Sequence, residues 1–179
     1  MKISKIHHVA YRCNDAKETV EWYGKHLKMD FVLAIAEDRV PSTKEPDPYM
    51  HVFLDAGNGN VLAFFELPTK PKMGKDPNTP EWVQHIAFEV PDRETLLAFR
   101  ASLEAAGIEV LGVTDHSLFH SIYFFDPNGH RIELACPDPE EEAKLRRLDA
   151  VKWEMLEEWS RTKKAPRHAA WMHEKQLAD

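Results

Sequence analysis

The sequence repeats itself once, and this repeat constrains the fold more than any other feature. The stretch HHVAYRCNDAKETVEWYGKHL resembles the later stretch QHIAFEVPDRETLLAFRASL. An offset of 77 positions aligns His8 with His85 and Asp15 with Asp92, and the apolar positions between them also match. Self-similarity at a fixed spacing indicates two copies of one structural module.

Each copy has the pattern of a strand, a helix and three further strands. An alternating strand is followed by Asp or Asn at a helix N-cap and then by an amphipathic helix. The turn sequences DAGNGN and DPNGH supply the Gly residues that hairpins require. The expected later strands lie at about 31–36, 49–54 and 60–67 in the first copy and at about 108–113, 118–125 and 130–136 in the second.

The pattern predicts an α+β fold in which two βαβββ modules form a mixed-sheet cup. We expect the first module at 1–67, a Pro- and Lys-rich linker at 68–82 and the second module at 83–136. The first module also contains a polar, Pro-rich segment at 37–48, which predicts a long loop.

A helical extension is expected at 137–179. Asp138 is the expected N-cap, with Pro139 at the first helical position and Glu141 three residues past the cap. The apolar stripe that follows predicts a long helix packed on the domain or on a second subunit; it includes Leu145, Leu148, Met155 and Trp159.

Composition excludes several classes of function. With 43% hydrophobic and 30% charged residues, the chain has the composition of a soluble globular protein. The net charge of −7 argues against a nucleic-acid partner, and no apolar run is long enough to cross a membrane. No secretory signal is evident, so we expect a cytoplasmic protein in which Cys13 and Cys136 are free thiols.

Strand alternation places polar residues of both copies on the sheet faces opposite the helices. The apolar residues of each first strand should face the helices, which leaves His8 and His85 on the other face. On the last strand of each copy the same reasoning predicts Glu66 beside His8 and Glu133 beside His85. Two imidazoles with carboxylates suit Fe(II), Mn(II), Co(II), Ni(II) or Zn(II) better than Ca(II) or Mg(II).

These βαβββ repeats, with His on the first strand and Glu on the fourth, resemble the vicinal oxygen chelate superfamily. That superfamily includes glyoxalase I, methylmalonyl-CoA epimerase, extradiol ring-cleaving dioxygenases and the fosfomycin and bleomycin resistance proteins. The resemblance implies a cup around one divalent metal held by His8, Glu66, His85 and Glu133, within a chain or across a homodimer. Glu66 is the least certain member of this set.

The stretch TDHSLFHSIYFFDPNGHRIEL is similar to the signature of the extradiol dioxygenases. The resemblance implies that Glu133 binds the metal, that Tyr123 contacts the substrate or bound oxygen, and that His116 lines the pocket. His120 is a second candidate for a substrate contact, although alternation places it on the helix side.

Three functions remain open at this point. A site of two His and one carboxylate on Fe(II) leaves three positions, enough for a catechol and dioxygen, which favours an extradiol dioxygenase. If Glu66 is a fourth ligand, a glyoxalase-like isomerase or an epimerase acting on an α-hydroxycarbonyl substrate is indicated, with a glutamate as the base. The third hypothesis is a metal-free protein that binds a small aromatic molecule.

Overall fold

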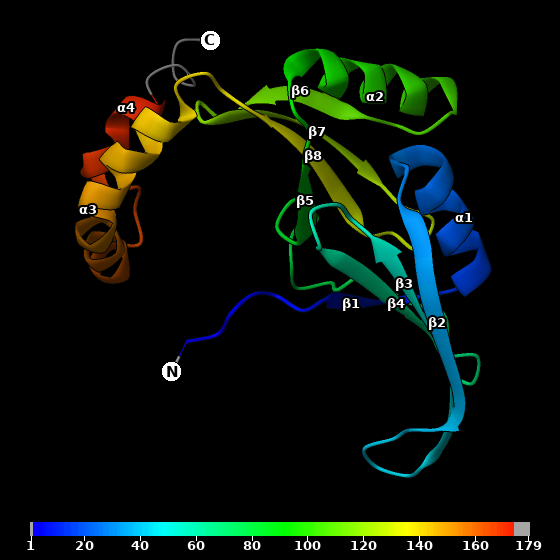
Figure 1. The fold of residues 1–179 in the computed structure, drawn as a ribbon. Helices are drawn as coiled ribbons and strands as arrows, with labels where there is room; N and C mark the ends of the chain where they lie inside the picture. Colours follow the sequence, from blue (N-terminus) through cyan, green and yellow to red (C-terminus); the bar gives the residue numbers. More distant parts are fainter. Residues whose placement is uncertain (1, 174–179) are drawn as a thin grey trace.

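The structure is a computed structural model that describes residues 2–173, and it contains two four-stranded sheets that each carry one helix (Figure 1). The first module consists of β1 (Val9–Cys13), α1 (Ala16–Leu27), β2 (Asp30–Arg39), β3 (Pro46–Asp55) and β4 (Val61–Glu66). The second consists of β5 (His85–Glu89), α2 (Arg93–Ala105), β6 (Leu111–Asp115), β7 (Phe119–Phe125) and β8 (Arg131–Pro137). The predicted α+β fold of two βαβββ modules with a C-terminal helix is confirmed.

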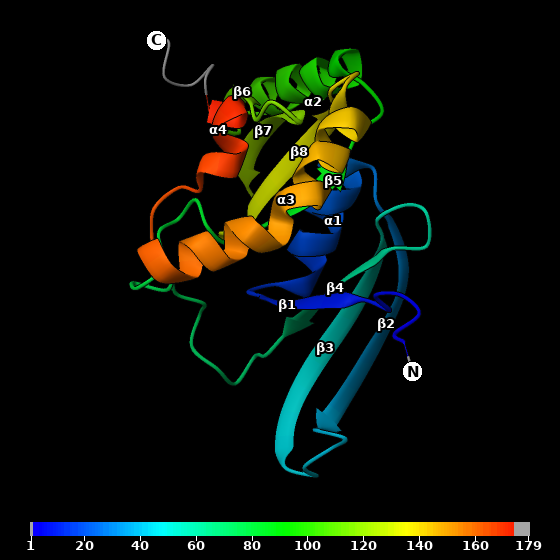
Figure 2. The same ribbon diagram turned by 90° about the vertical axis from the view of Figure 1, so that its left-hand side faces the viewer.

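The two sheets have the same topology. Their strand orders are β1-β4-β3-β2 and β5-β8-β7-β6, with the first pair of each sheet parallel and the others antiparallel. Half of the predicted loop at 37–48 is strand, because β2 and β3 continue into it and form a long hairpin that projects from the body (Figure 2). Its turn is closed by backbone hydrogen bonds between Val40 and residues Lys44 and Glu45.

The helices pack on one face of each sheet and bury a common core. Tyr23 of α1 and Phe64 of β4 are fully buried, and Phe124 of β7 is 1% exposed. Trp22 and Tyr23 of α1 are neighbours, and Trp22 also contacts Phe124, so α1 joins the two modules. We call the opposite face of each sheet, which carries no helix, its inner face.

The turn between β7 and β8 fastens the second module to the first. The Asp126 carboxylate accepts hydrogen bonds from the backbone of Asn128 and His130 and from the Tyr23 hydroxyl at 3.2 Å. The Asn14 backbone N–H donates to the Asn128 side chain at 2.8 Å. This turn therefore has a role in packing as well as in reversing the chain.

The C-terminal helices form an arm beside the second sheet. The long helix α3 (Glu141–Thr162) is followed by η1 (Arg167–Ala169) and α4 (Ala170–His173), and the arm lies apart from both sheets (Figure 1). Helix α3 begins two residues later than predicted, with Glu140 at the N-cap, and the Asp138 carboxylate accepts from the Glu140 backbone.

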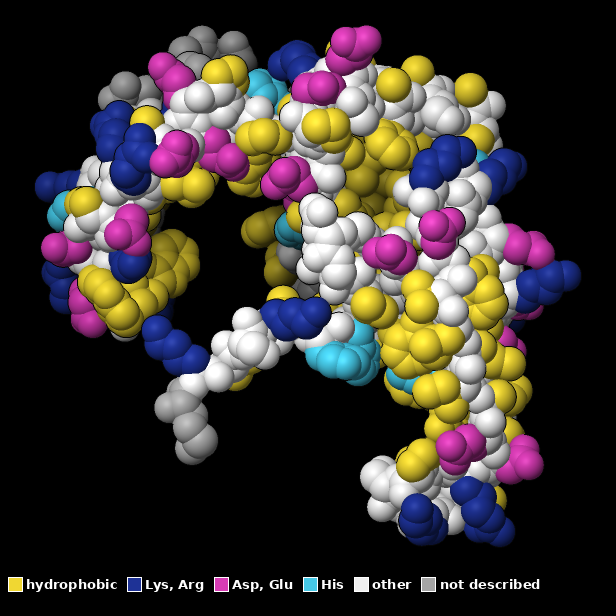
Figure 3. All heavy atoms as spheres, in the orientation of Figure 1, with side chains coloured by type: hydrophobic (Ala, Val, Ile, Leu, Met, Phe, Trp, Pro, Cys, Tyr) yellow, Lys and Arg dark blue, Asp and Glu magenta, His cyan; other side chains and the backbone are white. Residues whose placement is uncertain are grey.

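Helix α3 buries none of its residues in the described part of the chain. Leu145, Trp153, Leu156 and Trp159 remain between 47% and 67% exposed. Apolar side chains of the arm border a hollow between the arm and the rest of the molecule (Figure 3). The packing on the domain that the apolar stripe allowed is therefore absent from residues 2–173.

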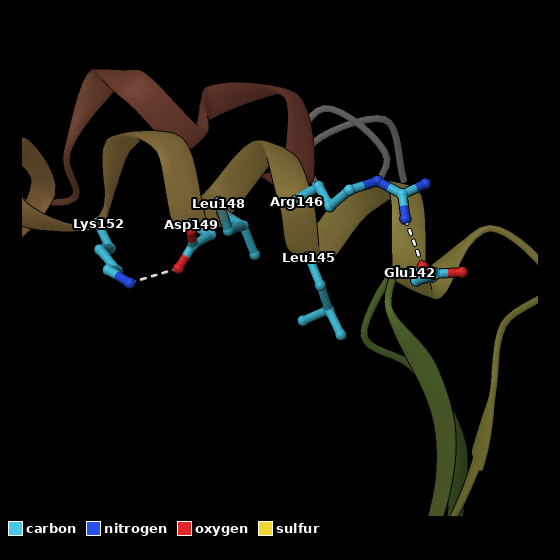
Figure 4. Close-up of a pocket in the computed structure, with 6 residues that line it drawn as sticks. All are labelled: Glu142, Leu145, Arg146, Leu148, Asp149 and Lys152. Atoms are coloured by element: carbon cyan, nitrogen blue, oxygen red, sulfur yellow. Dashed lines mark hydrogen bonds and ion pairs between the residues drawn. The ribbon is translucent and has the colours of Figure 1, made fainter.

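A shallow pocket on α3 is lined by residues of that helix alone (Figure 4). Its charged members are paired, Arg146 with Glu142 and Lys152 with Asp149, while Leu145 points outward. This surface holds no unpaired catalytic group. Within residues 2–173 no helix is both long and apolar enough to span a membrane.

Candidate metal centre

His85 and Glu133 meet on the inner face of the second sheet. They lie on the neighbouring strands β5 and β8, and the His85 Nε2 atom is 2.9 Å from the Glu133 Oε2 atom. The other ring nitrogen, Nδ1, is 3.0 Å from the carbonyl oxygen of Val83. Since a carbonyl only accepts, Nδ1 donates there, which leaves Nε2 directed at the carboxylate, either as a second N–H donor or as a lone pair.

The Glu133 carboxylate is held by a second set of groups. Its side chain is 4% exposed, and its Oε1 atom accepts hydrogen bonds from the Ser121 hydroxyl and from the Tyr123 hydroxyl at 3.0 Å. The strand register brings these residues together. Tyr123 is paired with Glu133, and Ser121, two positions before Tyr123 on β7, lies on the same face. Ser121 was not predicted, although the same alternation places it beside Tyr123.

Tyr123 connects this carboxylate to His116. The Tyr123 hydroxyl is 2.7 Å from the His116 Nε2 atom, so His116 donates to the oxygen while the hydroxyl proton points at Glu133. Burial and the charge of Glu133 raise the pKa of Tyr123 to about 12. The phenol is therefore a neutral hydrogen-bond donor at physiological pH, and the three side chains form one hydrogen-bonded chain.

The donor set fits a divalent transition metal. Two acceptor atoms, the Nε2 lone pair and a carboxylate oxygen, face each other at 2.9 Å, which requires a proton or a cation between them. Two ligands about 2.1 Å from one ion and at right angles to each other are also about 3 Å apart. Imidazole with carboxylate suits Fe, Mn, Co, Ni or Zn.

Glu66 lies on the other face of its sheet, so the prediction that it shares a face with His8 is wrong. Its register partner on β1 is Cys13, which is 1% exposed in the core. The Glu66 Oε2 atom accepts a hydrogen bond of 2.8 Å from the backbone N–H of Ala16, the first residue of α1. The carboxylate thus satisfies one of the unpaired N–H groups at the helix start.

The counterpart of Glu133 in the first module is Ala63. The register pairs Ala87 with Glu133 in the second sheet and Ala10 with Ala63 in the first. Ala63 is fully buried and has no metal-binding atom. The inner face of the first sheet therefore contributes no carboxylate at the position where the second sheet has Glu133.

His8 immediately precedes β1 and lies on the first module, away from His85 and Glu133. Its ring neighbours are His7, His51 and Phe53, with the His51 ring centroid at 6.1 Å. In the described part of the chain no three His, Cys, Asp or Glu side chains are close enough together to hold a metal. The structure thus brings together one histidine and one glutamate of the predicted ligand set.

The inner face of the first sheet also carries His51 of β3. Its partner across the β3–β4 pair is Phe65, whose ring stacks on that of His51 with centroids 3.6 Å apart. The His51 Nε2 atom is buried without a hydrogen-bond partner. His51, Phe53 and Phe65 form an aromatic wall on the inner face of the first sheet.

His120 is not brought to the site. It is paired in register with the buried Cys136, so it shares the helix-side face of β7 with Ile122, as alternation indicated. Its ring lies 4.0 Å from the Asp115 carboxylate. The predicted substrate contact therefore receives no support from this geometry.

The fold and the site define a protein of paired βαβββ modules with a His–Glu pair on the inner face of one sheet. Residues 5–134 match the family model of the Glyoxalase/Bleomycin resistance protein/Dioxygenase superfamily. The chain belongs to this superfamily. The C-terminal arm lies outside the matched region.

Individual relatives are more distant. The chain is 27% identical over 88 residues to the putative ring-cleaving dioxygenase MhqA of Bacillus subtilis, a match that covers 49% of this chain and 28% of that protein. Among solved structures, glyoxalase I of Leishmania major is 22% identical with a TM-score of 0.58, covering 85% of this chain and 98% of its own. FosX of Listeria monocytogenes, a fosfomycin resistance protein solved with Mn(II), is 19% identical with a TM-score of 0.57, covering 79% and 99%.

Proposed function

We propose that this chain is a metal-dependent, ring-cleaving dioxygenase of the extradiol type that acts on a catechol-like small molecule. The observation that carries the proposal is the position of Glu66. Since its carboxylate binds the start of α1, the predicted ligand set reduces to His8, His85 and Glu133. Two histidines and one carboxylate form the ligand set of non-haem Fe(II) oxygenases, so Fe(II) is the metal that we assign.

The proposal includes a homodimer that completes this ligand set. His85 and Glu133 lie on one module and His8 on the other, so a second copy would bring its His8 to the pair. The inner side of such a dimer would cover apolar residues of β2 that the single chain leaves 44–55% exposed, namely Phe31, Val32, Leu33 and Ile35. Exposed apolar area of this kind favours association with another subunit.

The bound metal would supply the position at which the catechol oxygens and dioxygen meet and exchange electrons. The side chains of this chain would bind the substrate and move its protons. Tyr123, held neutral by its raised pKa, would donate a hydrogen bond to negative charge that develops on a substrate oxygen. His116 would supply or accept the proton at the Tyr123 oxygen, 2.7 Å away.

The isomerase or epimerase hypothesis loses its fourth ligand. It called for Glu66 as that ligand, and for Glu66 or Glu133 as the base that removes a proton next to a carbonyl. Glu133 remains, but three hydrogen-bonding groups engage its two oxygens. The metal-free binding hypothesis would explain the close approach of His85 Nε2 to Glu133 Oε2 as a hydrogen bond, and the metal test below distinguishes the two.

Oxygen uptake tests the proposal directly. The protein is loaded anaerobically with Fe(II) and then exposed to dioxygen with 4-methylcatechol or catechol, while the ring-fission product is followed by absorbance. We expect uptake that depends on the catechol and is absent in His85→Ala. A protein that holds iron tightly and consumes no oxygen with any catechol would contradict the proposal.

Mixing two inactive variants tests the shared site. His8→Ala and His85→Ala are each expected to lose metal, and co-expression should restore part of it, because a mixed dimer contains one intact ligand set. Metal content by mass spectrometry and subunit number by light scattering are the measurements. No recovery, together with a monomeric wild-type protein, would show that the site does not span two chains.

A further inference from the structure

Arg131 is a charged residue of the inner face without an anionic partner. It is the first residue of β8, two positions before Glu133, and its register partners are His85 on β5 and Phe125 on β7. Alternation therefore puts its side chain on the face that carries the His–Glu pair. No ion pair or hydrogen bond joins its guanidinium to any residue within 2–173.

The guanidinium is nevertheless held in place. Its central carbon lies 4.3 Å from the centroid of the Tyr123 ring, a cation–π contact, and its Nε atom is buried without a hydrogen-bond partner. A buried cationic donor is costly unless an anion satisfies it. The other buried arginine Nε, on Arg12, belongs to a guanidinium that donates to the Pro71 carbonyl, whereas Arg131 has no such acceptor.

We propose that Arg131 binds the carboxylate of an aromatic substrate, so that the protein prefers a dihydroxybenzoate to a neutral catechol. This inference rests on the proposed function and names the substrate class within it. The planar fork of arginine matches a carboxylate with two parallel hydrogen bonds.

The spacing along β8 agrees with this class of ligand. Residues two apart on a strand are separated by about 7 Å, which is the span of one substituted benzene ring. A carboxylate at Arg131 would therefore place hydroxyl groups on the far side of the ring near Glu133 and His85. The ring itself would lie beside Tyr123, whose hydroxyl points at the same carboxylate ligand.

Calorimetric titration of the full-length protein loaded with Zn(II), which performs no redox chemistry, tests the inference without turnover. The three probes are 3,4-dihydroxybenzoate, its neutral analogue 4-methylcatechol and benzoate, which lacks the hydroxyl groups. In the wild type we expect 3,4-dihydroxybenzoate to bind at least about 10-fold more tightly than 4-methylcatechol.

The variants assign this preference to one side chain. Arg131→Met keeps an unbranched chain over the Tyr123 ring but removes the charge, and we expect it to abolish the preference without weakening 4-methylcatechol binding. Arg131→Lys keeps the charge without the fork and should retain an intermediate preference. Arg100→Met, on the surface of α2 where Arg100 pairs with Glu104, is the control and should behave as wild type.

The outcomes separate the two proposals. If the wild type shows no preference, or Arg131→Met keeps it, the inference about Arg131 is wrong, whatever the oxygen-uptake result. If benzoate binds as tightly as 3,4-dihydroxybenzoate, both in a manner that depends on Arg131, and 4-methylcatechol does not bind, the anion site stands and the dioxygenase proposal fails. Circular dichroism of each variant confirms that it is folded.

Discussion

The two sheets share a backbone plan and differ in what their inner faces carry. The second sheet presents His85, Tyr123 and Glu133; the Tyr123 hydroxyl donates to the Glu133 carboxylate, and the His85 Nε2 atom lies 2.9 Å from it. At the position of Glu133 the first sheet has Ala63. Its inner face instead presents His51 and Phe65, two stacked rings.

This difference shows that the two modules share their strand order and register but not the side chains on their inner faces. A polar half can hold a metal, and an aromatic half can cover a flat ring, so the two unlike faces complement each other in the function that we propose. A symmetric pair of His–Glu modules would instead present four ligands and leave fewer open positions on the ion.

The largest expected effect is a difference in metal content between variants of Glu133 and Glu66. Glu133→Ala should abolish stoichiometric metal binding, because it removes a ligand, while Glu66→Ala should keep the metal and lower the free energy of unfolding by about 1–2 kcal/mol. Metal analysis and urea denaturation measure the two quantities. Metal loss in Glu66→Ala would return that residue to the ligand set and remove the asymmetry.

Neighbouring phenylalanines on β4 test the assignment of faces. Phe64 is fully buried against α1, so Phe64→Ala should cost about 3–5 kcal/mol of unfolding free energy. Phe65 lies on the inner face, and Phe65→Ala should cost only about 1–2 kcal/mol while altering the wall beside His51. Equal costs in thermal and urea unfolding would contradict the register described for this strand.

The smallest expected effect is a pH dependence from the first sheet. Burial raises the pKa of the Cys13 thiol from 9.0 to about 11, and nearby Glu66 adds to the shift. Below pH 9 the thiol is protonated in both states; between pH 9 and 11 only the unfolded chain ionises, so stability falls as the pH rises.

Cys13→Ala should remove about 1 kcal/mol of the stability loss between pH 8 and pH 10. Urea denaturation of wild type and variant at both pH values measures this difference. An identical pH dependence in the two proteins would show that Cys13 does not ionise differently on unfolding. The result reports on the environment that Cys13 shares with Glu66 on the helix side.

The sequence alone determined the order of strands and helices in both modules and the part of the candidate site that lies on the second sheet. The repeat and its alternation predicted both βαβββ units and placed His85, Tyr123 and Glu133 on one face. The prediction for Glu133 succeeded because Arg131 to Leu134 of β8 alternates between polar and apolar residues, so the direction of each side chain has one solution.

Only the tertiary structure decided the rest. In β4 the run Leu62 to Phe65 is apolar at every position, so a period of two fits either phase, and pairing with β1 and β3 chose the one that turns Glu66 toward α1. The apolar stripe of α3 correctly predicted a helix. Periodicity shows which side of a helix is apolar, but not which surface covers that side, because this depends on contacts with residues far away in the sequence.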